Sequence, residues 1–273
     1  MKTSIHTPKF SLGKWCFLFI GGSILFTIVY ALATIPEHNI VNNWISGTLS
    51  LICGVLLLLM YRWLVRSYEE RKIEELSMQK SLKDTGIGFL WGMLMMAAII
   101  GVFAICGWYR ITGCSFDIAA IYRFLMTYFV VAVGEEIVFR GIMFRLFDSQ
   151  FNLWVALIFS SFLFGAAHII NPNATVVSTV GISLASGVLF GLLFKYYRTL
   201  WVPIGIHWSW NFVQGTVAGC PVSGGAPDYS ILESFTSGPE LFTGGLFGPE
   251  ASVITMAIGF VMCVWIGIKL FKR

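Results

Sequence analysis

Charged side chains are scarce in this sequence. Lysine, arginine, aspartate and glutamate together make up 12% of its 273 residues, whereas 57% of the residues are hydrophobic. Soluble domains carry about 25% charged residues, and a chain of this length has too little interior to hide so much apolar surface in one core. The composition therefore excludes an ordinary water-soluble domain and favours the lipid bilayer as the surrounding solvent.

A concentrated basic surface is also missing. The formal net charge is only +4, and the lysines and arginines are spread over the ends of apolar segments. Nucleic-acid binding is typically marked by a basic patch or stripe. We therefore expect the lipid bilayer, and no nucleic acid, among the partners of this chain.

Closely spaced cysteine pairs are absent as well. Six cysteines occur, none in a Cys-x-x-Cys spacing, so neither a zinc knuckle nor a redox motif is indicated. We interpret most of them as apolar fillers of helices. Cys114 and Cys220 fall in loops expected on the same side of the membrane, and the sequence leaves open whether they form a disulfide.

Long apolar runs dominate the chain. A helix needs about 20 apolar residues to cross the hydrocarbon core, and such continuous runs are helical because lipid offers no hydrogen-bond partner to an open backbone. Eight segments qualify: 15–34, 44–64, 86–107, 118–147, 153–171, 178–197, 200–217 and 251–270. The sequence thus predicts an all-α, polytopic membrane protein with about eight transmembrane helices. Lysines precede the first run as in a signal peptide, but we expect a retained helix.

Basic residues alternate between the loops that connect these segments. They gather near both ends of the chain and in the segment 62–83, whereas three connections contain no lysine or arginine: 35–43, 172–177 and 218–250. Because loops rich in lysine and arginine stay in the cytoplasm, we expect both termini on the cytoplasmic side. Arg110 and Arg123 are the exceptions to this pattern.

Two stretches are predicted to lie outside the bilayer. Residues 68–83 have acidic and apolar spacings typical of a short amphipathic helix on the cytoplasmic side. Residues 218–250 are rich in glycine, serine and proline, which favours a structured outer loop or lid. We expect this loop to affect substrate access more than chemistry, because it carries no base or nucleophile with a partner.

Few polar or ionisable side chains fall deep within the predicted spans. Ionisable groups at bilayer depth are costly and usually functional. Five such groups and one amide stand out: Glu135, Glu136, Arg140, His168, His207 and Asn211. The two remaining histidines, His6 and His38, lie outside the predicted spans.

The two adjacent glutamates are expected to behave differently. At 100° per residue, Glu136 and Arg140 lie on nearly the same helix face, so they should form an ion pair that keeps Glu136 ionised. Glu135 points about 100° away and has no such partner. A buried carboxyl without a counter-ion is suited to act as a general base near neutral pH. A purely structural ion pair would explain Glu136 and Arg140 but would leave Glu135 uncompensated.

The histidines and the amide suggest how such a base would be used. His168 follows three small residues that allow a second helix to approach. His207 and Asn211 lie one turn apart on one face, and both can donate hydrogen bonds to a developing oxyanion. Each group alone also fits an ordinary polar contact between helices. Together with Glu135 they indicate activation of water by a carboxylate beside two imidazoles.

A metal ion is the competing use of the same side chains. Glu135, His168 and His207 form a candidate ligand set for zinc or another divalent ion, with an open position for water. Neither His-Glu-x-x-His nor Glu-x-x-His occurs in the chain. The residues alone leave both alternatives open.

Three sequence patterns connect these residues with a known family. Glu-Glu-x-x-x-Arg, Phe-x-x-x-His and His-x-x-x-Asn stand in this order at Glu135–Arg140, Phe164–His168 and His207–Asn211. In these patterns the chain resembles the CAAX protease and bacteriocin-processing family, also called CPBP or Abi. The resemblance covers residues 118–217 and implies a catalytic core like that of the CAAX endopeptidases.

The resemblance divides the chain into three parts. Residues 1–117 would hold the N-terminal transmembrane helices and the cytoplasmic connection, residues 118–217 the core, and residues 218–273 the outer loop and the last helix. It also implies a multi-pass protein of a bacterial cell membrane. The substrate would be a peptide or membrane protein, and the role the processing of bacteriocins or signal peptides, or self-immunity.

The resemblance further assigns roles to the site residues. Glu135 would activate water with His168 as its partner, His207 and Asn211 would stabilise the oxyanion, and two supporting residues would hold them in place: Glu136 and Arg140. The family is described both as glutamate-type peptidases and as metalloproteases. The cofactor is therefore expected to be either none or a divalent metal such as zinc.

Two other classes of function would use the same cavity. A non-enzymatic immunity or scaffold protein would bind a peptide partner there, although such a binder has no need of Glu135. A proton-coupled transporter would use Glu135 and His168 as a relay, but the paired broken helices of inverted repeats are not apparent in the sequence. Peptide hydrolysis is the interpretation that accounts for all six residues.

Overall fold

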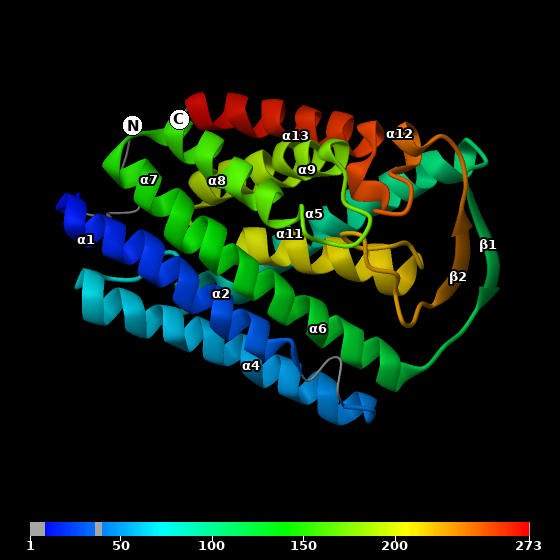
Figure 1. The fold of residues 1–273 in the computed structure, drawn as a ribbon, viewed down its shortest axis with the longest axis horizontal. Helices are drawn as coiled ribbons and strands as arrows, with labels where there is room; N and C mark the ends of the chain where they lie inside the picture. Colours follow the sequence, from blue (N-terminus) through cyan, green and yellow to red (C-terminus); the bar gives the residue numbers. More distant parts are fainter. Residues whose placement is uncertain (1–8, 36–39, 273) are drawn as a thin grey trace.

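The computed structural model describes residues 9–35 and 40–272, so that His6 and His38 lie outside the described part. Figure 1 shows a bundle of long helices lying side by side, with a small sheet at one end. In the first half of the chain the helical elements are α1 (Leu12–Cys16), η1 (Phe17–Gly21), α2 (Gly22–Ala33), α4 (Asn43–Leu64), η2 (Val65–Glu69), α5 (Met78–Ile105), α6 (Ile118–Glu136), η3 (Ile137–Phe144) and α7 (Arg145–Gln150). Here η1, η2 and η3 are π-helical stretches that continue the preceding helices.

The second half is built in the same way. Its helical elements are α8 (Leu153–Ala167), α9 (Val176–Ile182), η4 (Ser183–Val188), α10 (Leu189–Tyr197), α11 (Trp201–Asn211), η5 (Phe212–Val217), α12 (Glu240–Thr243), η6 (Pro249–Ala251) and α13 (Val253–Phe271). Polar N-caps mark several starts, since the side chains of Asn42, Asp117 and Asn152 accept hydrogen bonds from the first turns of α4, α6 and α8.

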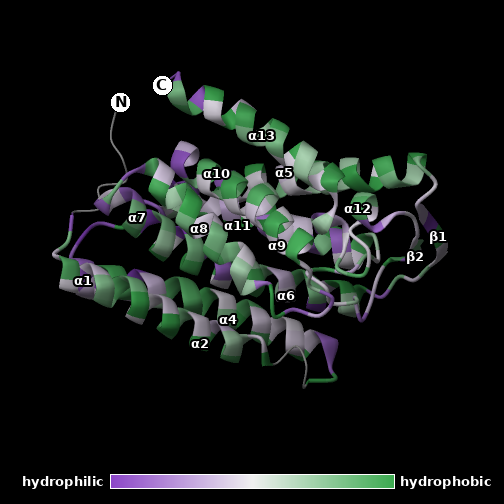
Figure 2. Cartoon of the chain, turned by 45° about the horizontal axis from the view of Figure 1, so that its top comes forward, coloured by the Kyte–Doolittle hydropathy of each residue, from purple (hydrophilic) through white to green (hydrophobic). Residues whose placement is uncertain are grey.

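The structure confirms the predicted all-α membrane architecture. Six helices of the described part are long and apolar enough to cross a bilayer: Leu12–Ala33, Asn43–Glu69, Met78–Ile105, Ile118–Gln150, Val176–Tyr197 and Val253–Phe271. The other two predicted spans correspond to the shorter helices α8 and α11 with η5. Figure 2 shows hydrophobic residues running along the outer helices α2, α4 and α13.

The short helix α11 lies in the interior of the bundle. Ten of its eleven residues are buried, and its backbone approaches that of α5 closely. A Cβ atom on Gly88 would lie 2.1 Å from the carbonyl oxygen of Val202, and one on Gly205 would lie 2.3 Å from that of Thr85. Glycines thus let the two helices pack backbone to backbone, which fixes α11 at the centre of the fold.

The predicted amphipathic helix at 68–83 is wrong. The helix of α4 continues through η2 to Glu69, the chain turns at Glu70 in the left-handed conformation, and α5 begins at Met78 rather than near residue 86. The reason is burial: Glu69 and Glu75 are 4% and 0% exposed. Both carboxylates pair with arginines inside the protein, which draws the connection inward.

A two-stranded antiparallel sheet closes the opposite end of the bundle. Strand β1 (Tyr109–Cys114) pairs with β2 (Leu232–Thr236), with an irregularity between Ile111 and Gly113. This pairing, which joins the connection between α5 and α6 to the outer loop 218–250, was not predicted from the sequence. Among the described residues all six cysteines are free, so Cys114 and Cys220 form no disulfide here, and the Cys220 thiol lies 3.8 Å from Thr236 Oγ1.

Candidate active site

Three separate helices bring the sequence-predicted site residues together. Glu135 and Glu136 end α6, His168 caps the C-terminus of α8, and His207 lies on α11. The Nε2 atoms of His168 and His207 each lie 3.9 Å from Glu135 Oε2. One carboxylate oxygen therefore faces both imidazoles.

Glu136 joins α6 to α11. Its Oε1 accepts hydrogen bonds from Arg140 Nη1 at 2.9 Å and from His207 Nδ1 at 3.0 Å. The ion pair predicted from the four-residue spacing is thus present and buried. Because Glu136 is paired with an arginine and accepts, His207 Nδ1 carries the hydrogen and the Nε2 atom is left to face Glu135. The contact between Glu136 and His207 was not predicted from the sequence.

His168 is oriented by its own helix. Its Nδ1 lies 2.8 Å from the carbonyl oxygen of Phe164, and because a carbonyl can only accept, Nδ1 is the donor. The ring of Phe164 lies 4.8 Å from the imidazole ring, centroid to centroid. The Phe-x-x-x-His spacing is thereby explained, since the phenylalanine supplies both the acceptor and the ring that fix His168.

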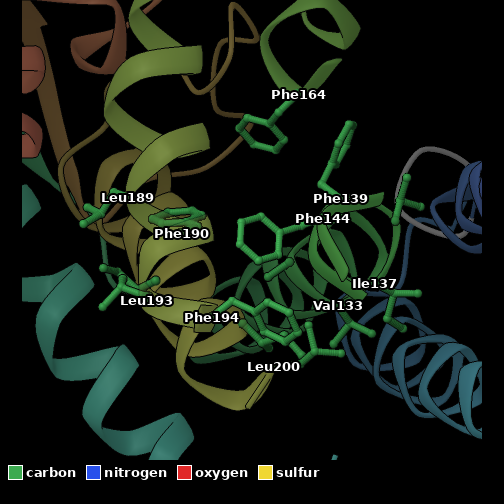
Figure 3. Close-up of a cluster of buried hydrophobic side chains, with 14 of the residues drawn as sticks. Val133, Ile137, Phe139, Phe144, Phe164, Leu189, Phe190, Leu193, Phe194 and Leu200 are labelled. Carbon is green, nitrogen blue, oxygen red and sulfur yellow. The ribbon is translucent and has the colours of Figure 1, made fainter. Parts of the chain in front are cut away.

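Arg140 connects the glutamates of the site to the neighbouring helices. Its guanidinium donates to the carbonyl oxygens of Ser186 and Gly187 in the π-helical stretch η4, at 3.1 and 3.2 Å. The rings of Phe164 and Phe190 lie 4.5 and 5.2 Å from the guanidinium carbon. Figure 3 shows these rings gathered with other phenylalanines where α8, α10 and η3 meet. Contacts with η4, α8 and α10 therefore hold Arg140 in place, and its charge balances that of Glu136.

Glu135 has a hydrogen-bond partner that the sequence analysis missed. Its Oε1 accepts from the hydroxyl of Tyr30 on α2 at 3.3 Å. Its Oε2 is buried and, among the described residues, has no hydrogen-bond partner. An orphaned buried carboxylate oxygen is costly, so this atom marks a place where a further group is expected to bind.

A small cavity lies beside the two imidazoles. It has a volume of about 20 Å³, which is room for roughly one water molecule. Its lining includes Phe164, His168, Ile182, Ser186, Phe190, His207, Trp210, Asn211, Ser223 and Glu250. Asn211 is thus placed beside His207 at the cavity, as its one-turn spacing on α11 indicated.

Glu250 is a third carboxylate at the site, and it comes from the predicted outer loop. It is 4% exposed, and it accepts hydrogen bonds from Gln214 Nε2 at 2.7 Å and from the backbone N–H of Ser223. Burial raises the pKa of Glu250, and its hydrogen bonds and the nearby His168 oppose this only in part. The expectation that this loop carries no base or nucleophile with a partner is wrong, because the carboxylate of Glu250 has hydrogen-bond donors at the cavity.

The spacing of the donor atoms can be compared with that of a metal site. A tetrahedral zinc ion with bonds of about 2.1 Å needs donor atoms roughly 3.4 Å apart. Here the two Nε2–Oε2 separations are 3.9 Å. Within residues 9–35 and 40–272, no three histidine, cysteine, aspartate or glutamate side chains are placed to hold a metal ion. As the side chains lie, the candidate ligand set does not fit zinc.

Comparison with known proteins supports the motif assignment. No curated protein matches the chain. Residues 117–213 match the sequence model of the family described as type II CAAX prenyl endopeptidase Rce1-like. The match begins at the N-cap of α6 and includes all six site residues predicted from the sequence. In an integral membrane protein, the segment 117–213 therefore carries the sequence pattern of the CAAX protease family.

Proposed function

We propose that this protein is a glutamate-type intramembrane endopeptidase in which Glu135 activates the attacking water. One observation carries the proposal: two imidazoles of fixed orientation face a single carboxylate oxygen that has no partner in the described part. A cavity that is lined by both imidazoles has room for roughly one water. The family match supports an intramembrane endopeptidase at the family level.

The hydrogen-bond count at this point favours acid–base chemistry. Glu135 Oε2 and the two Nε2 atoms are all acceptors when the imidazoles are neutral. A water has only two hydrogens, so a water that is bonded to all three atoms needs one of them to carry a proton. His207 is suited to hold that proton, because its Nδ1 faces the carboxylate of Glu136.

The reaction then follows from these positions. Glu135 takes one proton from the water as the water oxygen attacks the peptide carbonyl carbon, and a tetrahedral oxyanion forms. The Nε2–H of protonated His207 and the amide of Asn211 donate to that oxyanion. The carbon–nitrogen bond breaks as Glu135 passes its proton to the leaving amine, so that atoms and charges balance without a metal ion.

The substrate and setting are proposed from the family resemblance. The substrate is a peptide or a membrane protein whose scissile bond enters the bundle, and the role is bacteriocin or signal-peptide processing or self-immunity in a bacterial membrane. Both termini are proposed to be cytoplasmic. In support, the described start of the chain and the end of α13 lie at the same end of the bundle, opposite the sheet (Figure 1).

The test is cleavage of a reporter peptide library by the purified protein. We expect Glu135→Gln to fold normally and to lose about 10²–10⁴ in turnover, the usual cost of removing a general base. Glu240→Gln, at an exposed position on α12, is the matched control and should retain activity. Chelators should leave cleavage by the unmodified protein intact.

Two results would overturn this proposal. A fully active Glu135→Gln protein would remove the general base and leave the scaffold alternative in front. Complete loss of activity with EDTA or phenanthroline, restored by zinc, would favour a metallopeptidase with Glu135, His168 and His207 as ligands.

A further inference from the structure

Tyr30 connects the first transmembrane helix to the glutamate at the centre of the site. It lies on α2, outside the segment 117–213 that matches the family. Its hydroxyl donates to Glu135 Oε1 at 3.3 Å. The oxygen it binds is the one that does not face His168 and His207.

The ring of Tyr30 packs against the glycine that precedes Glu135, and this packing leaves no room for a side chain there. A Cβ atom added to Gly134 would lie 2.3 Å from Tyr30 Cδ2 and 2.8 Å from Cγ. Only a residue without a side chain therefore lets the ring lie against α6 directly before Glu135. The hydrogen bond and the close ring contact are two separate observations that place Tyr30 at this carboxylate.

Fixing one oxygen of a carboxylate fixes the other. Rotation about the last carbon–carbon bond of a glutamate is soft, so a donor at Oε1 restrains the direction of Oε2. A catalytic group must be held within about 0.5 Å of its productive geometry.

We propose that Tyr30 is a positioning residue that aims Glu135 Oε2 at the attacking water. This inference rests on the proposed function of Glu135. It extends the catalytic unit beyond the family segment to α2, so that the first helix has a role in turnover besides its role in packing.

Tyr61 provides a matched control on the neighbouring helix. It lies on α4 against a second glycine of the same long helix, since a Cβ on Gly141 would lie 3.1 Å from Tyr61 Cε2. Its hydroxyl donates to Glu75 at 2.7 Å and to the Gly141 carbonyl oxygen at 2.9 Å. Tyr61→Phe thus also removes a buried hydroxyl, but one that does not contact the site.

The experiment compares Tyr30→Phe with Tyr61→Phe in kcat, KM and melting temperature. Tyr30→Phe should lower kcat about 10-fold, the lower end expected for the loss of a bond to a charged group. KM should change by less than about twofold, because the variant alters the position of Glu135 and not the binding of the substrate. Tyr61→Phe should lower the melting temperature without lowering kcat per folded molecule.

A second variant keeps the inference testable if Tyr30→Phe fails to fold. Gly134→Ala retains the hydroxyl but displaces the ring, and it should reproduce the loss in kcat with KM nearly unchanged. An unchanged kcat in whichever of these variants folds, while Glu135→Gln is inactive, would reduce Tyr30 to a packing residue. An active Glu135→Gln protein would instead refute the proposed function itself.

Discussion

Two buried acid–base clusters in this protein differ in how completely they are satisfied. The connection cluster consists of Tyr61, Glu69, Arg71, Glu75 and Arg145, and each of its four carboxylate oxygens accepts a hydrogen bond. The site cluster consists of Glu135, Glu136, Arg140, His168 and His207. In this second cluster three buried atoms have no hydrogen-bond partner among the residues described: Glu135 Oε2, Glu136 Oε2 and Arg140 Nε.

The difference separates structural from reactive polar groups. Buried polar atoms are nearly always paired in folded proteins, and exceptions call for an explanation. The connection cluster follows this rule and holds the turn between α4 and α5 against α7. The site cluster departs from it at the oxygen that faces two imidazoles, which is where a water and a substrate carbonyl would supply the missing partners.

Removing Glu69 should give the largest loss of stability. Glu69 accepts from both Nη atoms of Arg145 and from Nε of Arg71, and Arg145 is 3% exposed. Breaking a buried pair typically costs about 3–5 kcal/mol, because the remaining charge is stranded. We expect Glu69→Gln to lower the melting temperature and the yield while the folded fraction retains its kcat.

Glu135→Gln is expected to behave in the opposite way to Glu69→Gln. It should keep its melting temperature and lose its turnover. If Glu69→Gln lost turnover per folded molecule to the same extent as Glu135→Gln, the division between a structural and a reactive cluster would not hold.

Removing Glu136 should lower both stability and turnover. The loss of stability should be smaller than in Glu69→Gln, and the loss of turnover smaller than in Glu135→Gln. Arg140 would lose its ion pair, but it would keep two backbone carbonyl oxygens and two ring faces. We therefore expect Glu136→Gln to cost about 3 kcal/mol, the lower end for a broken buried pair. Turnover should also fall, since His207 Nδ1 loses its carboxylate.

The double variant tests the electrostatic cause of that loss. Glu136→Gln combined with Arg140→Gln removes both charges, so part of the lost melting temperature should return. Activity should stay low, because the carboxylate that orients His207 is still missing. A double variant less stable than Glu136→Gln alone would show that Arg140 stabilises the fold through its carbonyl and ring contacts rather than through its charge.

Contacts within one helix could be predicted from the sequence. The four-residue spacing of Glu136 and Arg140 determines their pairing on a helix, and continuous apolar runs identified the transmembrane helices. Charge spacing cannot report burial, however. The acidic and basic residues of 68–83 fit an exposed amphipathic helix equally well, whereas in the structure Glu69 and Glu75 turn inward and pair with Arg71 and with Arg145 of α7.

Contacts between distant helices could not be predicted. The bonds from His207 to Glu136 and from Tyr30 to Glu135 join residues 71 and 105 positions apart. Tyr30 stands in an apolar run with no charge or motif to single it out. Glu250 carries a charge, but only the packing of η6 against the bundle brings it to the cavity. All three contacts depend on how the helices pack against one another, and the spacing of residues along the sequence does not encode this packing.

The smallest expected effects concern pH and have opposite signs at two buried glutamates. Burial alone would raise the pKa of Glu75, but the hydrogen bond and charge of Arg71 outweigh it and the pKa is lowered. The stability that Glu75 contributes is therefore present above the pKa of about 4.3 of an unfolded glutamate, and it is lost as pH falls through the lowered value. At Glu250 burial raises the pKa, so its contribution is present below about 4.3 and is lost as pH rises through the raised value.

Melting temperatures of Glu75→Gln and Glu250→Gln, each compared with the unmodified protein between pH 4 and pH 8, test these signs. Glu75→Gln should lower the melting temperature least at pH 4, because at that pH the carboxyl of Glu75 is closest to the protonated form that glutamine mimics. The melting temperature of Glu250→Gln, relative to that of the unmodified protein, should be highest at pH 8, because the unmodified protein then has to bury a charge beside the cavity. The exposed Glu240→Gln should show no such dependence. If Glu250→Gln compared best at pH 4 instead, the hydrogen bonds from Gln214 and Ser223 would outweigh burial, and Glu250 would act as a fixed negative charge facing His168 in the site.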